Sequence, residues 1–173
     1  MSTTQPIRSK QLLHDFKEYY LTKQPNSRNY TLILIGLNTA LRINDILHLT
    51  WGDVYCTEHS RFYTHLLITE KKTEKETRIL INRELQETLL SYRKTQTSIA
   101  DTDYLFPSPR KADSPLSRYQ AYRIVRKAAE AVGIEDVIRC HSLRKTFGYH
   151  AWKMGTPPAL LMEIYNHSSF QIT

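Results

Sequence analysis

The chain has 173 residues, 40% of them hydrophobic, which suffices for one domain with a buried core and excludes a wholly disordered or collagen-like protein. Its net charge of +7 at pH 7 favours a polyanionic partner such as nucleic acid. The two cysteines, Cys56 and Cys140, form no CxxC pattern and no apolar run reaches the ~18 residues of a membrane span, so we expect a cytoplasmic protein without disulfides or structural zinc.

The N-terminal half is predicted to contain three helices. Residues 1–9 are polar, and we expect them to be loose. Apolar residues then recur at helical spacing. The expected elements are a helix over residues 10–22, a second from about residue 30, a tight turn at residues 39–42, and a third helix from there to just before Trp51.

Three short β-strands are expected in the middle of the chain. Residues 54–55, 62–69 and 77–81 are rich in residues that favour strands. Between the last two lies the segment 70–76, which is charged and has no apolar residue, so it reads as the solvated tip of a hairpin. The three strands together predict a small antiparallel sheet.

The C-terminal half is again predicted to be helical, with recognisable start and stop residues. Asn82 and the Ser117/Gln120 capping box favour helix starts, and Gly133 and Gly155 favour helix ends. The expected helices cover residues 83–94, 118–132, 142–154 and 157–166. The predicted fold class is therefore mainly α (α+β), with a three-stranded antiparallel sheet.

Basic residues recur along the chain and form no single run, so folding can gather them onto one face. They include Lys71, Lys72, Lys75, Arg110, Lys111, Arg123, Arg126, Lys127, Arg144 and Lys145.

His141 and Arg144 are three residues apart and share a face of a predicted helix start, where imidazole and guanidinium can both donate to a phosphate oxygen. Two surface residues on a helix would give the same pattern. Arg42 directly follows an apolar segment, which places it either at a pocket edge or in a structural pair with Asp45. His167 follows a helix end and taken alone is an ordinary loop residue.

Metal and nucleotide chemistry are not indicated. The spacings of His141, His150 and His167 match no zinc pattern, and no carboxylates cluster with them. The chain also has no glycine-rich phosphate loop. We therefore expect a reaction without a cofactor.

Four segments, in this order, resemble the catalytic domain of the tyrosine recombinase (phage integrase) family over about residues 10–173. The first runs from Thr39 through Arg42 to Val54, with Ala40 where the family often has glycine. The second is the charged hairpin tip, where Lys72 fits the family's catalytic lysine and Lys71 and Lys75 remain alternatives.

The other two segments carry histidines. Cys140-His-Ser-Leu-Arg144-Lys145 resembles the family's HxLRHTF box, with Lys145 in place of a frequent histidine. Tyr165-Asn166-His167-Ser-Ser resembles its LGHSS box, and Tyr165 and Asn166 depart from leucine and glycine. The resemblance implies that Arg42, Lys72, His141, Arg144 and His167 are catalytic.

The resemblance also implies a reaction. A tyrosine attacks a DNA phosphate, forms a 3′-phosphotyrosyl link and frees a 5′-hydroxyl. The 5′-hydroxyl of a second strand can later attack this link and reverse the step. The family's nucleophile lies about nine residues after the last histidine, beyond Thr173, so we expect residues 1–173 to be a single catalytic domain that lacks both the nucleophile and the family's N-terminal core-binding domain. The chain is then either a fragment or a short recombinase of the fimbrial-switch inverting type.

The expected partner is double-stranded DNA, bound by a homo-oligomer (a tetramer) that is a monomer without DNA. The residues expected to hold the DNA backbone are Lys71, Lys75, Arg123, Lys127 and Lys145. Two alternatives remain open: a type IB topoisomerase-like enzyme with the same chemistry, and a DNA-binding regulator with a recombinase-like fold.

Overall fold

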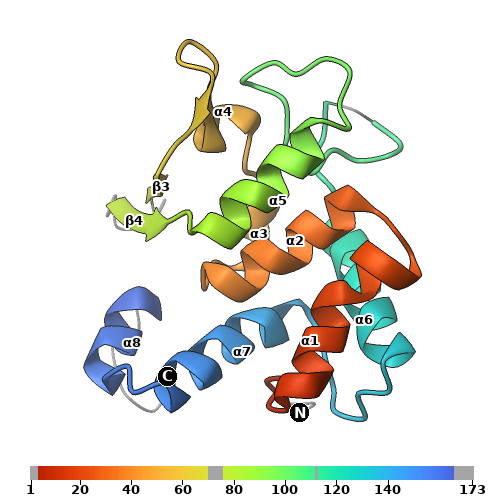
Figure 1. Ribbon diagram of the computed structural model, residues 1–173, viewed down its shortest axis with the longest axis vertical. Helices are drawn as coiled ribbons and strands as arrows, with labels where there is room; N and C mark the ends of the chain where they lie inside the picture. Colours follow the sequence, from red (N-terminus) through yellow and green to blue (C-terminus); the bar gives the residue numbers. More distant parts are fainter. Residues whose placement is uncertain (1–3, 70–75, 112, 166–173) are drawn as a thin grey trace.

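The computed structural model describes residues 4–69, 76–111 and 113–165 (Figure 1). The described chain is mainly helical with small antiparallel ladders, as the sequence predicted. The predicted helix over residues 10–22 is present, but its last turn is widened into a π-helix. The elements of the N-terminal half are α1 (Lys10–Glu18), η1 (Tyr19–Lys23), α2 (Ser27–Asn38), α3 (Ile43–Leu47) and α4 (Trp51–Val54).

Helix α2 is the centre of the hydrophobic core. It lies between α1 on one side and α5 (Arg83–Arg93) on the other, and it also packs against α7 (Cys140–Lys153) (Figure 1). Its apolar side chains surround the helix axis almost completely, which is the pattern of a fully buried helix. The buried residues of this helix are Asn29, Thr31, Leu32, Ile33, Leu34, Ile35 and Gly36.

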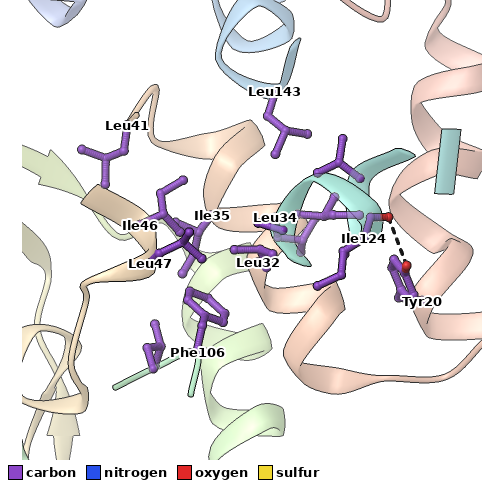
Figure 2. Close-up of a cluster of buried hydrophobic side chains, with 14 of the residues drawn as sticks. Tyr20, Leu32, Leu34, Ile35, Leu41, Ile46, Leu47, Phe106, Ile124 and Leu143 are labelled. Atoms are coloured by element: carbon purple, nitrogen blue, oxygen red, sulfur yellow. Dashed lines mark hydrogen bonds between the residues drawn. The ribbon is translucent and has the colours of Figure 1, made fainter. Parts of the chain in front are cut away.

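One loop and two helices contribute side chains that close this core around the central helix. The side chains of α2 meet Phe106 from the loop before α6 (Arg118–Ala131), Ile124 from α6 itself, and Leu143 from α7 (Figure 2). The Tyr20 hydroxyl donates to the Ile124 carbonyl at 3.0 Å, which anchors η1 to α6.

A glycine sets the distance between α2 and α7. A Cβ atom added at Gly36 would lie 3.2 Å from the Leu143 Cβ and would overlap its Cδ1. The two helices can therefore approach closely only because position 36 has no side chain. This approach brings the first turn of α7 beside the turn that follows α2.

The predicted three-stranded sheet is wrong: the described strands form two separate two-stranded antiparallel ladders. β1 (Tyr55–Cys56) pairs with β2 (Arg61–Phe62), and β3 (His65–Thr69) pairs with β4 (Glu76–Leu80) in the register His65↔Leu80 to Thr69↔Glu76. The expected strand 62–69 is interrupted at residues 63–64. Val54 ends helix α4, whose start is fixed by a capping box between Thr50 and Asp53, so it belongs to no strand.

The predicted ends of the later helices are confirmed. Asn82 caps α5, and the Ser117/Gln120 capping box starts α6. Gly133 and Gly155 follow α6 and α7 with φ of 74° and 93°, the left-handed region that glycine adopts freely. Helix α8 (Pro158–Tyr165) begins at the expected proline-containing turn. None of the helices in the described part of the chain is long and apolar enough to cross a membrane.

The expectation of a loose N-terminus is wrong for residues 4–9. Ile7 is only 3% exposed, its N–H donates to Thr146 Oγ1 at 2.9 Å, and its carbonyl accepts from His150 Nε2 at 2.9 Å. Both partners lie on α7. One buried isoleucine in a polar segment gave no periodic signal, which is why the sequence did not reveal this contact.

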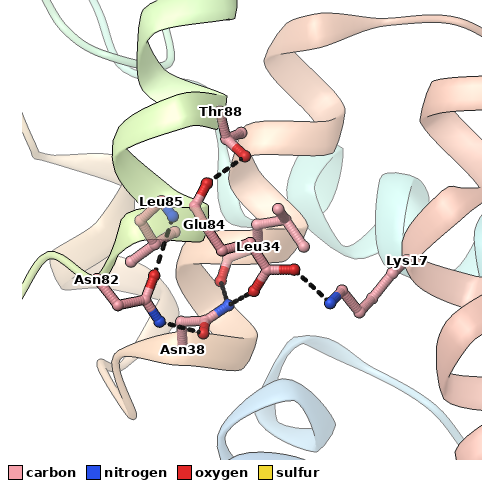
Figure 3. Close-up of polar contacts among 7 residues, drawn as sticks. All are labelled: Lys17, Leu34, Asn38, Asn82, Glu84, Leu85 and Thr88. Carbon is pink, nitrogen blue, oxygen red and sulfur yellow. Dashed lines mark hydrogen bonds and ion pairs between the residues drawn. The ribbon is translucent and has the colours of Figure 1, made fainter.

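A polar network joins α1, α2 and α5 at one edge of the core (Figure 3). Glu84 accepts from Lys17 Nζ at 2.5 Å and from Asn38 Nδ2 at 3.2 Å. Asn82 has two roles: its Oδ1 accepts from the Leu85 N–H at 2.9 Å as the cap of α5, and its Nδ2 donates to Asn38 Oδ1 at 2.8 Å.

We therefore expect Asn82→Ala to lower the free energy of unfolding by about 2 kcal/mol, because it removes a helix cap and a partly buried hydrogen bond together. The matched control is Ser9→Ala, which removes only the cap bond of α1 to Leu12 and should cost about 1 kcal/mol. Urea denaturation of both variants measures the difference. Equal costs would contradict a structural role for the Asn82–Asn38 bond.

Candidate active site

The tight turn between α2 and α3 presents Arg42. Ala40 in this turn has φ 54°, in the left-handed region. Glycine adopts this conformation without strain, whereas alanine adopts it at an energetic cost. Arg42 is exposed at the N-terminus of α3, and its carbonyl accepts the first N–H groups of that helix, from Asp45 at 2.9 Å and Ile46 at 3.1 Å.

Arg144, in contrast, is buried, with 6% of its surface exposed. Its Nη1 donates to the Ala40 carbonyl and its Nη2 donates to the Tyr165 carbonyl at 2.7 Å. The guanidinium therefore bridges the turn before α3 and the last described residue of α8. A buried cation requires such acceptors, because its loss of hydration is otherwise uncompensated.

Two surface hollows meet at these arginines. The first, of about 600 Å³, lies where the starts of α3, α6 and α7 come together, and His141 lines it beside Arg144. Four of its lining residues are arginines and none of the lining residues described is acidic, so the hollow is suited to an anion. The arginines are Arg42, Arg118, Arg139 and Arg144.

The second hollow, of about 630 Å³, is also lined by Arg42 and Arg144 but lies between α3, the β3–β4 ladder and the end of α8. Thr69 and Thr77 from that ladder and Tyr165 from α8 contribute to its wall. Asp45 and Asp53 line it as well, so its charge is mixed.

Several predicted site residues lie outside the described residues. Lys71, Lys72 and Lys75 belong to the segment 70–75, and His167 follows Tyr165 by two positions. The described residues that flank these segments, Thr69 and Tyr165, line the second hollow. Of the predicted catalytic set, the structure brings Arg42, His141 and Arg144 together.

The described members of the predicted DNA-backbone set, Arg123, Lys127 and Lys145, do not line these two hollows. Arg123 and Lys127 are exposed on α6 and line a different hollow, of about 720 Å³, between α6 and the segment joining η1 to α2. The Lys145 ammonium donates to the Thr4 carbonyl at 2.7 Å.

The prediction missed Arg118 and Arg139, which line the first hollow. Arg118 is the first residue of α6, directly after the predicted cap Ser117, and Arg139 is the N-cap residue of α7, two positions before His141. Arg118 was identifiable as a cation at a predicted helix start, whereas Arg139 lies three residues before the predicted start at residue 142. Neither was part of a basic cluster noted in the sequence.

Tyr165 is the first residue of the second histidine box, and it is 5% exposed. Its hydroxyl donates to the Arg144 carbonyl at 2.6 Å. Burial raises the pKa of this hydroxyl to about 12, and the nearby Arg144 guanidinium offsets only part of the effect. Such a hydroxyl is not poised to attack near neutral pH. Within the described residues, no three His, Cys, Asp or Glu side chains are grouped to hold a metal ion.

Comparison with known proteins gives consistent matches. Residues 5–173 match the profile described as the Phage integrase family. The probable integrase/recombinase YoeC of Bacillus subtilis is 44% identical over 173 residues, which cover 100% of this chain and 88% of that protein. The type 1 fimbriae regulatory protein FimE of Escherichia coli K12 is 31% identical over 147 residues, covering 85% of this chain and 72% of that protein.

Solved structures share the fold. The crystal structure of XerA recombinase superposes with a TM-score of 0.78 at 21% identity, covering 98% of this chain and 59% of that chain. A lambda integrase dimer bound to a COC′ core site gives 0.71 at 15% identity, covering 99% and 59%. The chain thus spans about three-fifths of these recombinase chains.

The buried hydroxyl of Tyr165 predicts a pH dependence. Its pKa is about 12 in the folded state and about 10 in the unfolded state, so the stability it contributes is present below pH 10 and is lost as the pH rises toward 12. We expect the free energy of unfolding of the wild-type chain to fall more steeply than that of Tyr165→Phe between pH 10 and 12, and the two curves to run parallel below pH 10. Urea titrations across this range that give parallel curves throughout would contradict burial of the hydroxyl.

Proposed function

The chain belongs to the phage integrase family of tyrosine recombinases, and from this premise we propose that it acts in site-specific DNA recombination by holding a scissile DNA phosphate between Arg42 and Arg144. Strand cleavage would proceed through a 3′-phosphotyrosyl intermediate. The 5′-hydroxyl of a second strand would then attack this intermediate and rejoin the DNA. The observation that carries the proposal is that these two arginines, far apart in sequence, line the same two hollows.

The two arginines would stabilise the transition state of phosphoryl transfer. Negative charge gathers on the non-bridging oxygens of the phosphate, and a guanidinium offers fixed N–H donors that cannot lose their protons near pH 7. Arg144 is held by main-chain carbonyls, so its orientation is set before substrate arrives. Arg42 is exposed and can approach the phosphate from the solvent side.

We propose supporting roles for the remaining residues of the family pattern. His141 lines the first hollow beside Arg144 and would donate a further hydrogen bond or assist removal of the tyrosine proton. His167 would donate another hydrogen bond. Lys72, in the segment of sequence between β3 and β4, would protonate the leaving 5′-oxygen, and Lys71 and Lys75 are the alternatives for this role.

The basic residues around the hollows would bind the DNA backbone. We assign this role to Arg118 and Arg139, in addition to the residues expected from the sequence, which are Lys71, Lys75, Arg123, Lys127 and Lys145. Neutralising several phosphates releases counterions, so DNA affinity should fall steeply with salt. On DNA we propose a homo-tetramer, assembled in the cytoplasm where the DNA lies.

The nucleophile is proposed to be none of the eleven tyrosines of this chain. Tyr165 is buried with its pKa raised to about 12. Tyr119 and Tyr122 do line the first hollow, so they are the internal residues against which this proposal has to be tested. A regulator that binds DNA without cutting it is the alternative. It predicts that the wild-type protein forms no covalent DNA complex in the first experiment below, whereas a recombinase forms one.

For the natural polypeptide that contains this chain, we expect Arg42→Ala to slow formation of the covalent DNA complex by about 100- to 1,000-fold, because one donor to the transition state is lost, while DNA affinity changes little. Arg42 is the better test than Arg144, because loss of Arg144 also removes its hydrogen bonds to the Ala40 and Tyr165 carbonyls. Arg83→Ala is the matched control, since Arg83 is an exposed arginine paired with Glu87 on α5. Normal covalent complex with Arg42→Ala would overturn the assignment.

For residues 1–173 alone, we expect no covalent complex with a pool of nicked duplexes of randomised sequence, examined on a denaturing gel. Any covalent product would be digested, and its modified tyrosine identified by mass spectrometry. A DNA adduct on Tyr119 or Tyr122 that disappears in the corresponding phenylalanine variant would contradict the proposal that the nucleophile is none of the tyrosines in this chain.

A further inference from the structure

Arg144 and Tyr165 form a reciprocal pair, in which the side chain of each binds the main chain of the other. Arg144 Nη2 donates to the Tyr165 carbonyl at 2.7 Å, and Tyr165 Oη donates to the Arg144 carbonyl at 2.6 Å. The Arg144 Cζ also lies 4.4 Å from the centroid of the Tyr165 ring. The guanidinium is therefore held by hydrogen bonds at its edge and by an aromatic ring at its face.

The fold makes room for this ring at a single position. Gly148 follows Arg144 by one turn of α7, and a Cβ added there would overlap the Tyr165 hydroxyl and lie 2.9 Å from Cζ of the ring. Phe147 packs against the ring edge-on, with centroids 6.4 Å apart. Tyr165 is thus enclosed by α7, and its ring has little freedom to move away from the guanidinium.

We propose that Tyr165 is a positioning residue, which fixes the Arg144 guanidinium in the orientation that receives a DNA phosphate. The inference rests on the proposed function, because it assigns the phosphate to the hollows that Arg144 lines. An arginine side chain loses considerable rotamer freedom when it binds a ligand. Ring and carbonyl contacts that order the guanidinium beforehand remove that cost from phosphate binding.

The same pair couples the end of α8 to the site. The Tyr165 carbonyl is the acceptor for Nη2, and Nη1 donates to the Ala40 carbonyl in the turn that presents Arg42. A displacement of Tyr165 would therefore release one edge of the guanidinium and loosen its link to the second arginine.

The first test observes the Arg144 side chain directly by NMR of the chain labelled with ¹⁵N-arginine, with Arg144→Lys used for assignment. Restricted rotation should give separate Nη signals in the wild type and in Tyr165→Phe, which keeps the ring. Tyr165→Leu should average them. Tyr149→Leu is the matched control, because Tyr149 lies beside Gly148 on α7 and its ring faces Arg8 and Lys153. In this control variant the Arg144 signals should stay separate.

Inorganic phosphate is the probe for function. We expect it to shift the Arg42 and Arg144 signals in the wild type and to bind about tenfold more weakly to Tyr165→Leu. Averaged Arg144 signals in the wild type, or separate signals retained in Tyr165→Leu, would overturn the inference. Separate signals that average in Tyr165→Leu but do not respond to phosphate would support the fixing of Arg144 by Tyr165 and would count against the proposed function.

A double-mutant cycle distinguishes loss of the ring contact from a general loss of folding. Gly148→Ala should lower the urea midpoint strongly in the wild type, because the added methyl overlaps the Tyr165 ring. The same change should lower the midpoint much less in Tyr165→Leu, where the ring is absent. Additive shifts would show that the ring does not occupy the space beside Gly148, and the inference would fail.

Discussion

The site depends on the hydrogen bonds that one buried cation donates. The Arg144 guanidinium lies under the surface with 6% exposure, and the acceptors described for it are main-chain carbonyls of Ala40 and Tyr165. Burying a guanidinium is unfavourable unless its donors are bound, so this one cation draws together the turn after α2, helix α7 and the end of α8. The position of Arg42, which the same turn presents, follows from that arrangement.

The core explains why the arrangement is stable. Helix α2 is apolar on nearly all sides, and Gly36 lets α7 approach it closely enough for the first turn of α7 to reach the turn at Ala40. Two hollows then share the arginine pair in their linings. One is also lined by Arg118, Arg139 and His141, and the other by residues of the β3–β4 ladder and α8.

Much of this architecture could be predicted from the sequence, because it rests on local signals. Helix periodicity, the Asn82 cap and the glycine stops gave the helices, and ordered motifs gave Arg42, His141 and Arg144. One local signal was overlooked, the Thr50–Asp53 capping box that starts α4. The pairing of the strands is a long-range property, and the predicted strands at residues 54–55, 62–69 and 77–81 were wrongly joined into one sheet. The burial of Arg144 was not predictable either, since its two acceptors are main-chain carbonyls, which a sequence does not reveal.

If Arg42 and Arg144 together form the phosphate site, a bound phosphate analogue must contact both side chains. Crystals of the chain soaked in tungstate would locate this anion by its anomalous scattering. We expect tungstate at the junction of the two hollows, within hydrogen-bond distance of both arginines, and its loss from that position in Arg42→Ala. Tungstate bound beside Arg123 and Lys127, with none at the arginine pair, would show that the two arginines do not form the phosphate site.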